Sequence, residues 1–164
     1  MMGWRVGYLA LPSAAAGAAP GLFGEVSKVQ DTIPICPSQL GMEVALGALE
    51  EGRGWVEERV AGLEANRAAL RGAFSSALGD GALVGGGGAI YLFARLPEHC
   101  PDDRAAVEWL VRRHGVCLIP GSSCGSPGHV RGSFANLPPP ACAEAAGRLA
   151  AGLDELARFG LRSE

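Results

Sequence analysis

Two arginine residues stand in segments that otherwise have the composition of buried strands. Arg5 lies within residues 3–11 (GWRVGYLAL), and Arg131 lies within residues 129–136 (HVRGSFAN). Arginine is rarely buried unless it is paired, and its planar guanidinium group can donate two parallel hydrogen bonds to a carboxylate or a phosphate. Each arginine therefore needs an anion. That anion could belong to a bound ligand or to an acidic side chain of the same chain. The remaining alternative is that the arginine stands at a strand end and its guanidinium group reaches solvent.

Lys28 and the cysteines are the other residues that could carry covalent chemistry. Lys28 is the only lysine of the chain, and its place between Val26 and Val29 predicts a solvated lysine on a helix. The five cysteines are odd in number and widely spaced, so we expect free thiols in a reduced compartment and no metal site. They are Cys36, Cys100, Cys117, Cys124 and Cys142.

Two further motifs could indicate a nucleophile and a phosphate-binding loop, but each is better explained as a structural connection. In GSSCGSPGH, a nucleophilic Cys124 beside His129 is one interpretation, but the segment has the composition of a tight connection, which is the interpretation we favour. The glycines of residues 85–88 are not followed by a helix start or by GKS/T, so they predict a flexible turn and no phosphate cradle.

The composition indicates a folded, water-soluble chain. Of its 164 residues, 48% are hydrophobic and 19% are charged, which excludes a disordered chain. No apolar run approaches the length of about 20 residues that a bilayer span needs. The net charge of −3 is not concentrated in blocks, so we expect neither a nucleic-acid nor a membrane partner.

Apolar periodicity predicts alternating strands and helices, and therefore an α/β or α+β fold. The most regular stripes are those of a helix over residues 55–74 and of a helix over residues 141–159 that buries Leu149, Leu153 and Leu156. The other predicted helices span residues 13–30, 38–51 and 102–114, and the predicted strands span residues 3–11, 89–96, 116–119 and 129–136.

The predicted strand at residues 3–11 has no hairpin partner within reach along the chain. Its neighbours would have to come from residues that this chain lacks, so the beginning of the sequence is expected to be cut. The strand and the apolar faces of the two following helices are then expected to leave a large apolar surface uncovered.

Several segments resemble, in order and spacing, the class I/II aminotransferases of fold type I. GWRVGYLALP resembles the sequence that follows their Schiff-base lysine, and GGGGAIYLFARLP, HGVCLIPGSSCG and GHVRGSFANL resemble their C-terminal small domain. KVQDTIPICPSQLGMEVALGALEEG and EWLVRRHGVCLIPGSSCG are similar to the plant aromatic aminotransferases that use methionine as amino donor. The resemblance runs from Gly3 to about Leu156 and implies a C-terminal part of that fold, with the large domain mostly absent.

The resemblance implies a role for each arginine. Arg5 matches the family's arginine that contacts the phosphate ester of pyridoxal phosphate, and Arg131 matches the arginine that grips the α-carboxylate of the substrate. The implied substrates are an amino acid, aromatic or methionine, and a 2-oxo acid, in a cytoplasmic homodimer. Gly132 stands where the family often has a bulky apolar residue, so we expect looser packing of this strand.

The family's catalytic lysine has no counterpart here. It stands eight residues before the arginine that Arg5 matches, and that position falls before the first residue of the chain. Lys28 follows a serine, as the family's lysine does, but Cys36 stands eight residues after it instead of arginine. We therefore assign no catalytic residue and expect the chain to be inactive by itself.

The resemblance also divides the chain. Residues 1–30 would be a remnant of the large cofactor-binding domain, residues 31–80 the interdomain helices, and residues 81–164 the small domain. Two alternatives remain at this point. The chain could be a non-catalytic binding or interaction module derived from such a small domain, or an unrelated α/β domain in which both arginines are structural.

Overall fold

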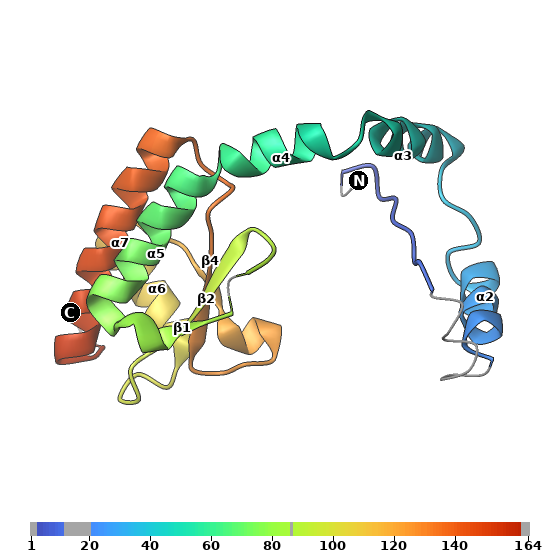
Figure 1. Ribbon diagram of the computed structural model, residues 1–164. Coiled ribbons are helices and arrows are strands. Elements are labelled where there is room, and N and C mark those ends of the chain that lie inside the picture. Colours follow the sequence, from blue (N-terminus) through green and yellow to red (C-terminus); the bar gives the residue numbers. More distant parts are fainter. Residues whose placement is uncertain (1–2, 12–20, 86, 162–164) are drawn as a thin grey trace. The chain divides into compact units, whose positions relative to one another are not determined.

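The computed structural model describes residues 3–11, 21–85 and 87–161 (Figure 1). The chain forms two compact units, residues 1–58 and residues 59–164. Within the described ranges, no helix is long and apolar enough to cross a membrane.

Among the described residues of the first unit, α2 (Leu22–Thr32) and α3 (Gln39–Glu51) are the helices that lie wholly within it. The side chain of Ser38 caps α3 by accepting a hydrogen bond from the backbone N–H of Gly41, and the helix ends before Gly52, as predicted. Helix α2 ends at Thr32, two residues beyond the predicted end and two residues before Pro34. The expected start of that helix, residues 13–20, lies outside the described residues.

The predicted buried strand at residues 3–11 is wrong. Residues 3–5 form a turn, residues 6–11 are irregular, and Tyr8 is 77% exposed. The physical reason is the one that the sequence indicated: no described strand pairs with this segment, so neither its backbone groups nor its apolar side chains are satisfied by a sheet. The segment does approach α3, because a Cβ atom at Gly41 would lie 2.8 Å from Cγ2 of Val6.

The first unit leaves much apolar surface exposed, as expected. Gly41 is its one buried residue among those described. Its exposed large apolar side chains are Trp4, Tyr8, Leu9, Leu11, Leu22, Phe23, Val29, Ile33, Ile35, Leu40, Met42, Leu46, Leu49, Trp55 and Val56.

The predicted helix over residues 55–74 is two helices, α4 (Arg53–Ala61) and α5 (Glu64–Leu78). The break falls at Gly62 and Leu63, and glycine costs about 1 kcal/mol more than alanine inside a helix. Burial follows the same division: Val60 in α4 is 59% exposed, whereas Phe74 in α5 is fully buried. Only the second half of the predicted apolar stripe therefore reaches a core.

The second unit is built around a four-stranded antiparallel sheet with the order β1-β2-β4-β3. Its strands are β1 (Leu83–Val84), β2 (Tyr91–Arg95), β3 (Ile119–Pro120) and β4 (His129–Ser133). The predicted strands at residues 89–96 and 129–136 are present but shorter, and the one at 116–119 is reduced to its end. Strand β1 was not predicted, because two residues carry no periodicity. Two short 3-10 helices, η1 (Asp80–Ala82) and η2 (Gly121–Cys124), complete the connections.

Helices α5, α6 (Asp103–His114) and α7 (Pro139–Phe159) pack against one face of this sheet. Figure 1 shows α5 and α7 side by side over the strands. Leu149, Leu153 and Leu156 of α7 are at most 1% exposed, which confirms the predicted stripe. The core also contains Leu70, Ala73, Phe74, Leu92, Ala94, Leu96, Cys100, Ala106, Val107, Leu110, Val116, Leu118, Val130, Phe134 and Ala146.

Gly132 does not loosen β4. It is buried, and a Cβ atom there would lie 3.1 Å from Leu70 Cδ2 and 3.4 Å from the ring of Phe74. Side chains of helix α5 therefore occupy the space that a bulky residue at this position would fill. The expectation of looser packing is wrong because the missing volume is supplied from across the core.

Helices α6 and α7 approach each other closely at Gly152. A Cβ atom at Gly152 would lie 2.6 Å from Leu110 Cδ2 and 2.9 Å from His114 Cδ2. One turn further along α7, Glu155 accepts a hydrogen bond of 3.0 Å from Arg113 and lies 3.2 Å from His114 Nε2. The hydrogen bond from Arg113 lowers the pKa of Glu155.

Gly152→Ala is expected to destabilise the second unit, because the added methyl group overlaps Leu110 and His114. Overpacking of this kind costs about 1–3 kcal/mol. Gly147→Ala in the same helix is the matched control: nothing lies within 4 Å of its added Cβ, so helix propensity should raise stability by about 0.5–1 kcal/mol. Urea unfolding followed by circular dichroism measures both. Equal stabilities of the two variants would contradict the close packing of α6 and α7.

Candidate functional site

The sheet face opposite the three helices carries the polar and aromatic side chains. Along β2 and β4 the residues alternate, so that Leu92, Ala94 and Val130 face the core while Tyr91, Phe93, His129 and Arg131 face away. Arg131 stands in the middle of this open face, because β4 is an inner strand of the sheet.

Neighbouring strands fix what surrounds Arg131. Phe93 of β2 lies opposite it on one side and Ile119 of β3 on the other. Its guanidinium carbon lies 4.5 Å from the centre of the Tyr91 ring, a distance typical of a cation–π contact. Phe93 and Ile119 on the two neighbouring strands therefore flank Arg131, and the Tyr91 ring lies against its guanidinium group.

Arg131 is half-buried, and within the described part of the chain no acidic side chain pairs with it. An aromatic ring attracts the guanidinium charge without neutralising it or using its hydrogen-bond donors. The alternative of an internal Asp or Glu partner is therefore absent among these residues. What remains is a partly desolvated cation whose hydrogen-bonding fork suits an external carboxylate.

His129 occupies the same open face. Its ring stacks on Phe93 with centroids 5.1 Å apart and an interplanar angle of 8°. Its Nδ1 atom lies 2.9 Å from the carbonyl oxygen of Pro127, and because a carbonyl only accepts, Nδ1 carries the hydrogen. The face thus combines one fixed cation with a flat aromatic surface.

Asp103 fixes the loop that leads into β4, and the sequence analysis did not single it out. The side chain is 3% exposed and accepts hydrogen bonds from Ser122 N at 2.9 Å, Ser122 Oγ at 2.7 Å and Gly128 N at 2.9 Å. Burial by itself would raise the pKa of Asp103, but the hydrogen bonds from Ser122, Gly128 and His129 outweigh it and lower the pKa. The sequence feature that could have revealed Asp103 is the pair of aspartates at the start of α6. Asp102 caps the helix, and Asp103 is then free to accept hydrogen bonds from the loop before β4.

Asn66 fixes the segment that leaves β4, and it was missed as well. It is 2% exposed, and its Nδ2 donates to the carbonyl oxygens of Phe134 at 3.0 Å and Leu137 at 2.9 Å. A lone asparagine in a predicted helix gives no signal of such a contact, since its partners are about 70 residues away. Both ends of the Arg131 strand are therefore tied by buried polar side chains.

The other predicted arginine belongs to the first unit. Arg5 lies in the exposed turn of residues 3–5, with φ of 57°, in the left-handed region that few non-glycine residues adopt. Lys28 lies on α2 and forms an ion pair of 2.6 Å with Glu25, both side chains being about 70% exposed. Lys28 is thus the solvated helix lysine that the sequence predicted.

The cysteines are free thiols, as expected. Cys100 and Cys142 are buried, and burial raises the pKa of both. Cys36, Cys117 and Cys124 are exposed. Among the residues that the structure describes, His, Cys, Asp and Glu side chains form no group of three that could hold a metal ion.

Comparison with known proteins assigns the chain to a family. The family model "Aminotransferase class I and II" matches residues 1–149. The chain is 46% identical to the aromatic aminotransferase ISS1 of Arabidopsis thaliana over 161 residues, which are 98% of this chain and 40% of that protein. It is 32% identical to an aspartate aminotransferase of Thermotoga maritima over 82% of this chain and 32% of that protein.

A solved structure agrees with the sequence comparison. The crystal structure of an aromatic aminotransferase from Pyrococcus horikoshii superposes with a TM-score of 0.74 and 28% sequence identity, over 94% of this chain and 40% of that chain. The chain therefore belongs to the class I and II aminotransferases. Its α/β fold, with an α+β second unit, is part of the aminotransferase fold, and it spans about two fifths of the length of these relatives.

Asp103→Asn is expected to destabilise the second unit by about 2 kcal/mol, because an amide NH₂ would face donors that now meet a carboxylate oxygen. Since the pKa of Asp103 is lowered in the folded state, its contribution to stability is present above about pH 4 and is lost as the pH falls below that value. The variant should therefore lose less stability on acidification than the unaltered chain does.

Asp102→Asn provides the control. Asp102 caps α6 by accepting from the backbone N–H groups of Arg104 and Ala105, and asparagine caps a helix about as well. Urea unfolding at pH 7 and at pH 3 compares the two variants. If the two changes cost the same at pH 7, Asp103 does not hold the loop before β4.

Proposed function

We propose that this chain supplies the carboxylate-binding arginine of an aminotransferase, and that this arginine is Arg131. The observation that carries the proposal is the half-buried Arg131 side chain on the open sheet face, with no acidic partner in the described part of the chain. Membership of the aminotransferase family supports the same role.

The chemistry of transamination explains why one arginine can serve the whole reaction. The amino acid that gives the amino group and the 2-oxo acid that receives it both carry a carboxylate next to the reacting carbon. A guanidinium fork held by β4 would grip that carboxylate in two parallel hydrogen bonds and so set the direction of the bond that reacts. The side chain of the substrate would lie beyond it, over the aromatic residues of the sheet face.

The family implies pyridoxal phosphate in the longer enzymes, but the described residues do not by themselves fit this cofactor. Its covalent anchor is a lysine, and Lys28 is engaged with Glu25 on an exposed helix face. Arg5 remains the proposed contact of the phosphate ester. The lysine would have to come from a longer polypeptide, so we expect these 164 residues to be inactive alone.

Further features are proposed on the strength of the relatives. Aromatic amino acids or methionine are the proposed amino donors, supported by the 46% identity with a protein named an aromatic aminotransferase. A homodimer and a cytoplasmic location are proposed for the full-length enzyme. The division into a large-domain remnant at residues 1–30, interdomain helices at 31–80 and a small domain at 81–164 stays a prediction.

The alternative of a non-catalytic interaction module is favoured by one observation, the many exposed apolar side chains of the first unit. Such a surface fits a polypeptide partner as well as a covalently linked domain. The two candidates differ in what Arg131 does: it binds substrate in the first and has no role in the second.

A hybrid enzyme tests the proposed function. Residues 3–161 replace the matching part of the Arabidopsis relative, and transamination from an aromatic amino acid is measured. Arg131→Gln should raise KM by about 100-fold, because a charged pair of hydrogen bonds to the substrate is lost. Arg71→Gln, on the exposed face of α5, should leave KM unchanged. An active hybrid whose KM is insensitive to Arg131→Gln would refute the assignment, and an inactive, folded hybrid would favour the interaction module.

The contact between Tyr91 and Arg131 gives a second test in the same hybrid. Tyr91→Leu removes the ring that supports the guanidinium group and should raise KM by about three- to tenfold with little change in kcat. Tyr91→Phe keeps the ring and should stay within about twofold of the unaltered hybrid. A loss of activity in both variants alike would mean that the hydroxyl group matters and not the ring.

A further inference from the structure

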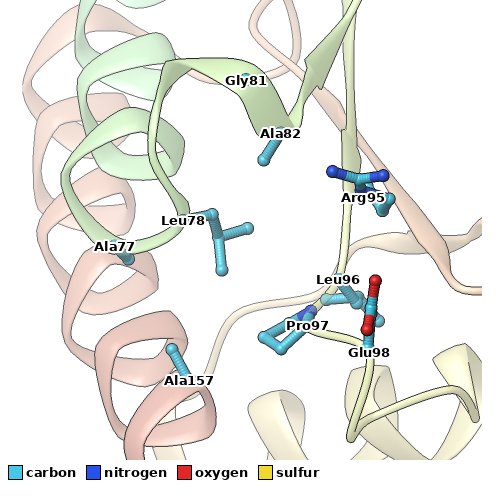
Figure 2. A pocket seen from close by; sticks show the side chains of 9 residues that line it. All are labelled: Ala77, Leu78, Gly81, Ala82, Arg95, Leu96, Pro97, Glu98 and Ala157. Carbon is cyan, nitrogen blue, oxygen red and sulfur yellow. The ribbon is translucent and has the colours of Figure 1, made fainter.

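A pocket of about 400 Å³ opens in the second unit, where the end of α5, the end of β2 and α7 meet (Figure 2). Its size lies within the range of about 300–1,000 Å³ typical of small-molecule sites. Arg131 is not among the residues that line it. They are Ala77, Leu78, Gly81, Ala82, Arg95, Leu96, Pro97, Glu98 and Ala157.

Most of the lining is apolar and rigid. Ala82 and Leu96 belong to the buried core, so their backbones are fixed by packing. Leu78 and Ala157 come from α5 and α7, which pack along each other. Pro97 follows directly after the buried Leu96 and restricts the backbone where the chain leaves β2. The pocket is therefore largely formed before any ligand arrives.

Two opposite charges stand on one side of this apolar pocket. Figure 2 shows the guanidinium group of Arg95 at the end of β2 and the carboxylate of Glu98 below it. They do not form an ion pair with each other, and neither pairs with another described side chain. Arg95 ends strand β2, and Glu98 lies three residues later. Together they offer a small molecule the N–H donors of a guanidinium group and the two acceptor oxygens of a carboxylate.

We infer that this pocket binds a free amino acid with an apolar side chain, such as leucine. An amino acid carries its carboxylate and its ammonium group on one carbon, so Arg95 would bind the first and Glu98 the second. The apolar side chain would then extend between Leu78, Ala82 and Pro97. This site is separate from Arg131, and it does not depend on the proposed function.

Ligands with a single charge fit this pair of side chains less well than an amino acid does. A fatty carboxylate would leave Glu98 next to its own negative charge, and an alkyl amine would leave Arg95 next to a positive one. A molecule with both charges at one end and an apolar group at the other matches each part of the lining. Binding of a small molecule of this size is expected in the range of about 1 mM.

The experiment titrates the 164-residue chain with L-leucine and follows its amide signals by NMR. Saturable shifts confined to residues that line the pocket are expected. N-acetyl-L-leucine lacks the ammonium charge and L-leucinamide lacks the carboxylate, so each should bind at least about tenfold more weakly. Equal binding of leucine and either derivative would overturn the inference, as would the lack of a saturable shift up to about ten times the expected dissociation constant.

Variants locate the site and separate it from the proposed function. Arg95→Gln and Glu98→Gln alter exposed side chains, so both should fold, and each should weaken leucine binding at least about tenfold. Arg71→Gln, on the exposed face of α5 and away from the pocket lining, should leave leucine binding unchanged. If Arg131→Gln abolishes the shifts and the two pocket variants do not, the amino acid binds on the open sheet face and the pocket is not its site.

Discussion

The alternation of side chains along β4 is the constraint on which the second unit depends. Val130 and Gly132 point into the core, and Gly132 is small enough for α5 to press Leu70 and Phe74 against the strand. Because successive residues of a strand face opposite sides, Arg131 must then stand on the open face. The same packing that stabilises the unit by burying apolar surface thus presents a cation to the outside.

Polar groups buried at both ends of β4 keep this presentation fixed. Asp103 ties the loop before the strand, and Asn66 ties the segment after it. Removing either partner would leave buried donors or carbonyls unsatisfied, which costs more than the bonds themselves contribute. The carboxylate-binding role proposed for Arg131 needs such support, because small displacements weaken a bidentate contact.

The two units differ in how far their own residues satisfy them. The second unit has a continuous core, whereas the described part of the first unit buries only Gly41 and exposes aromatic and aliphatic side chains. This contrast agrees with a chain that spans about two fifths of the length of its relatives. Among the described residues, the first unit keeps most of its large apolar side chains at the surface, and the second unit keeps its own in a core.

The sequence by itself indicated the family, through the motifs that resemble it. It also determined the α/β fold class, the helix that begins after Ser38 and the leucine stripe of α7, because these depend on local periodicity and capping chemistry. Only the tertiary structure decided what depends on distant partners. Residues 3–11 are not a strand because no described strand pairs with them, and Gly132 is tightly packed because α5 fills its space. The support of Arg131 by Tyr91, and of its strand by Asp103 and Asn66, likewise joins residues too far apart in the chain for spacing to reveal.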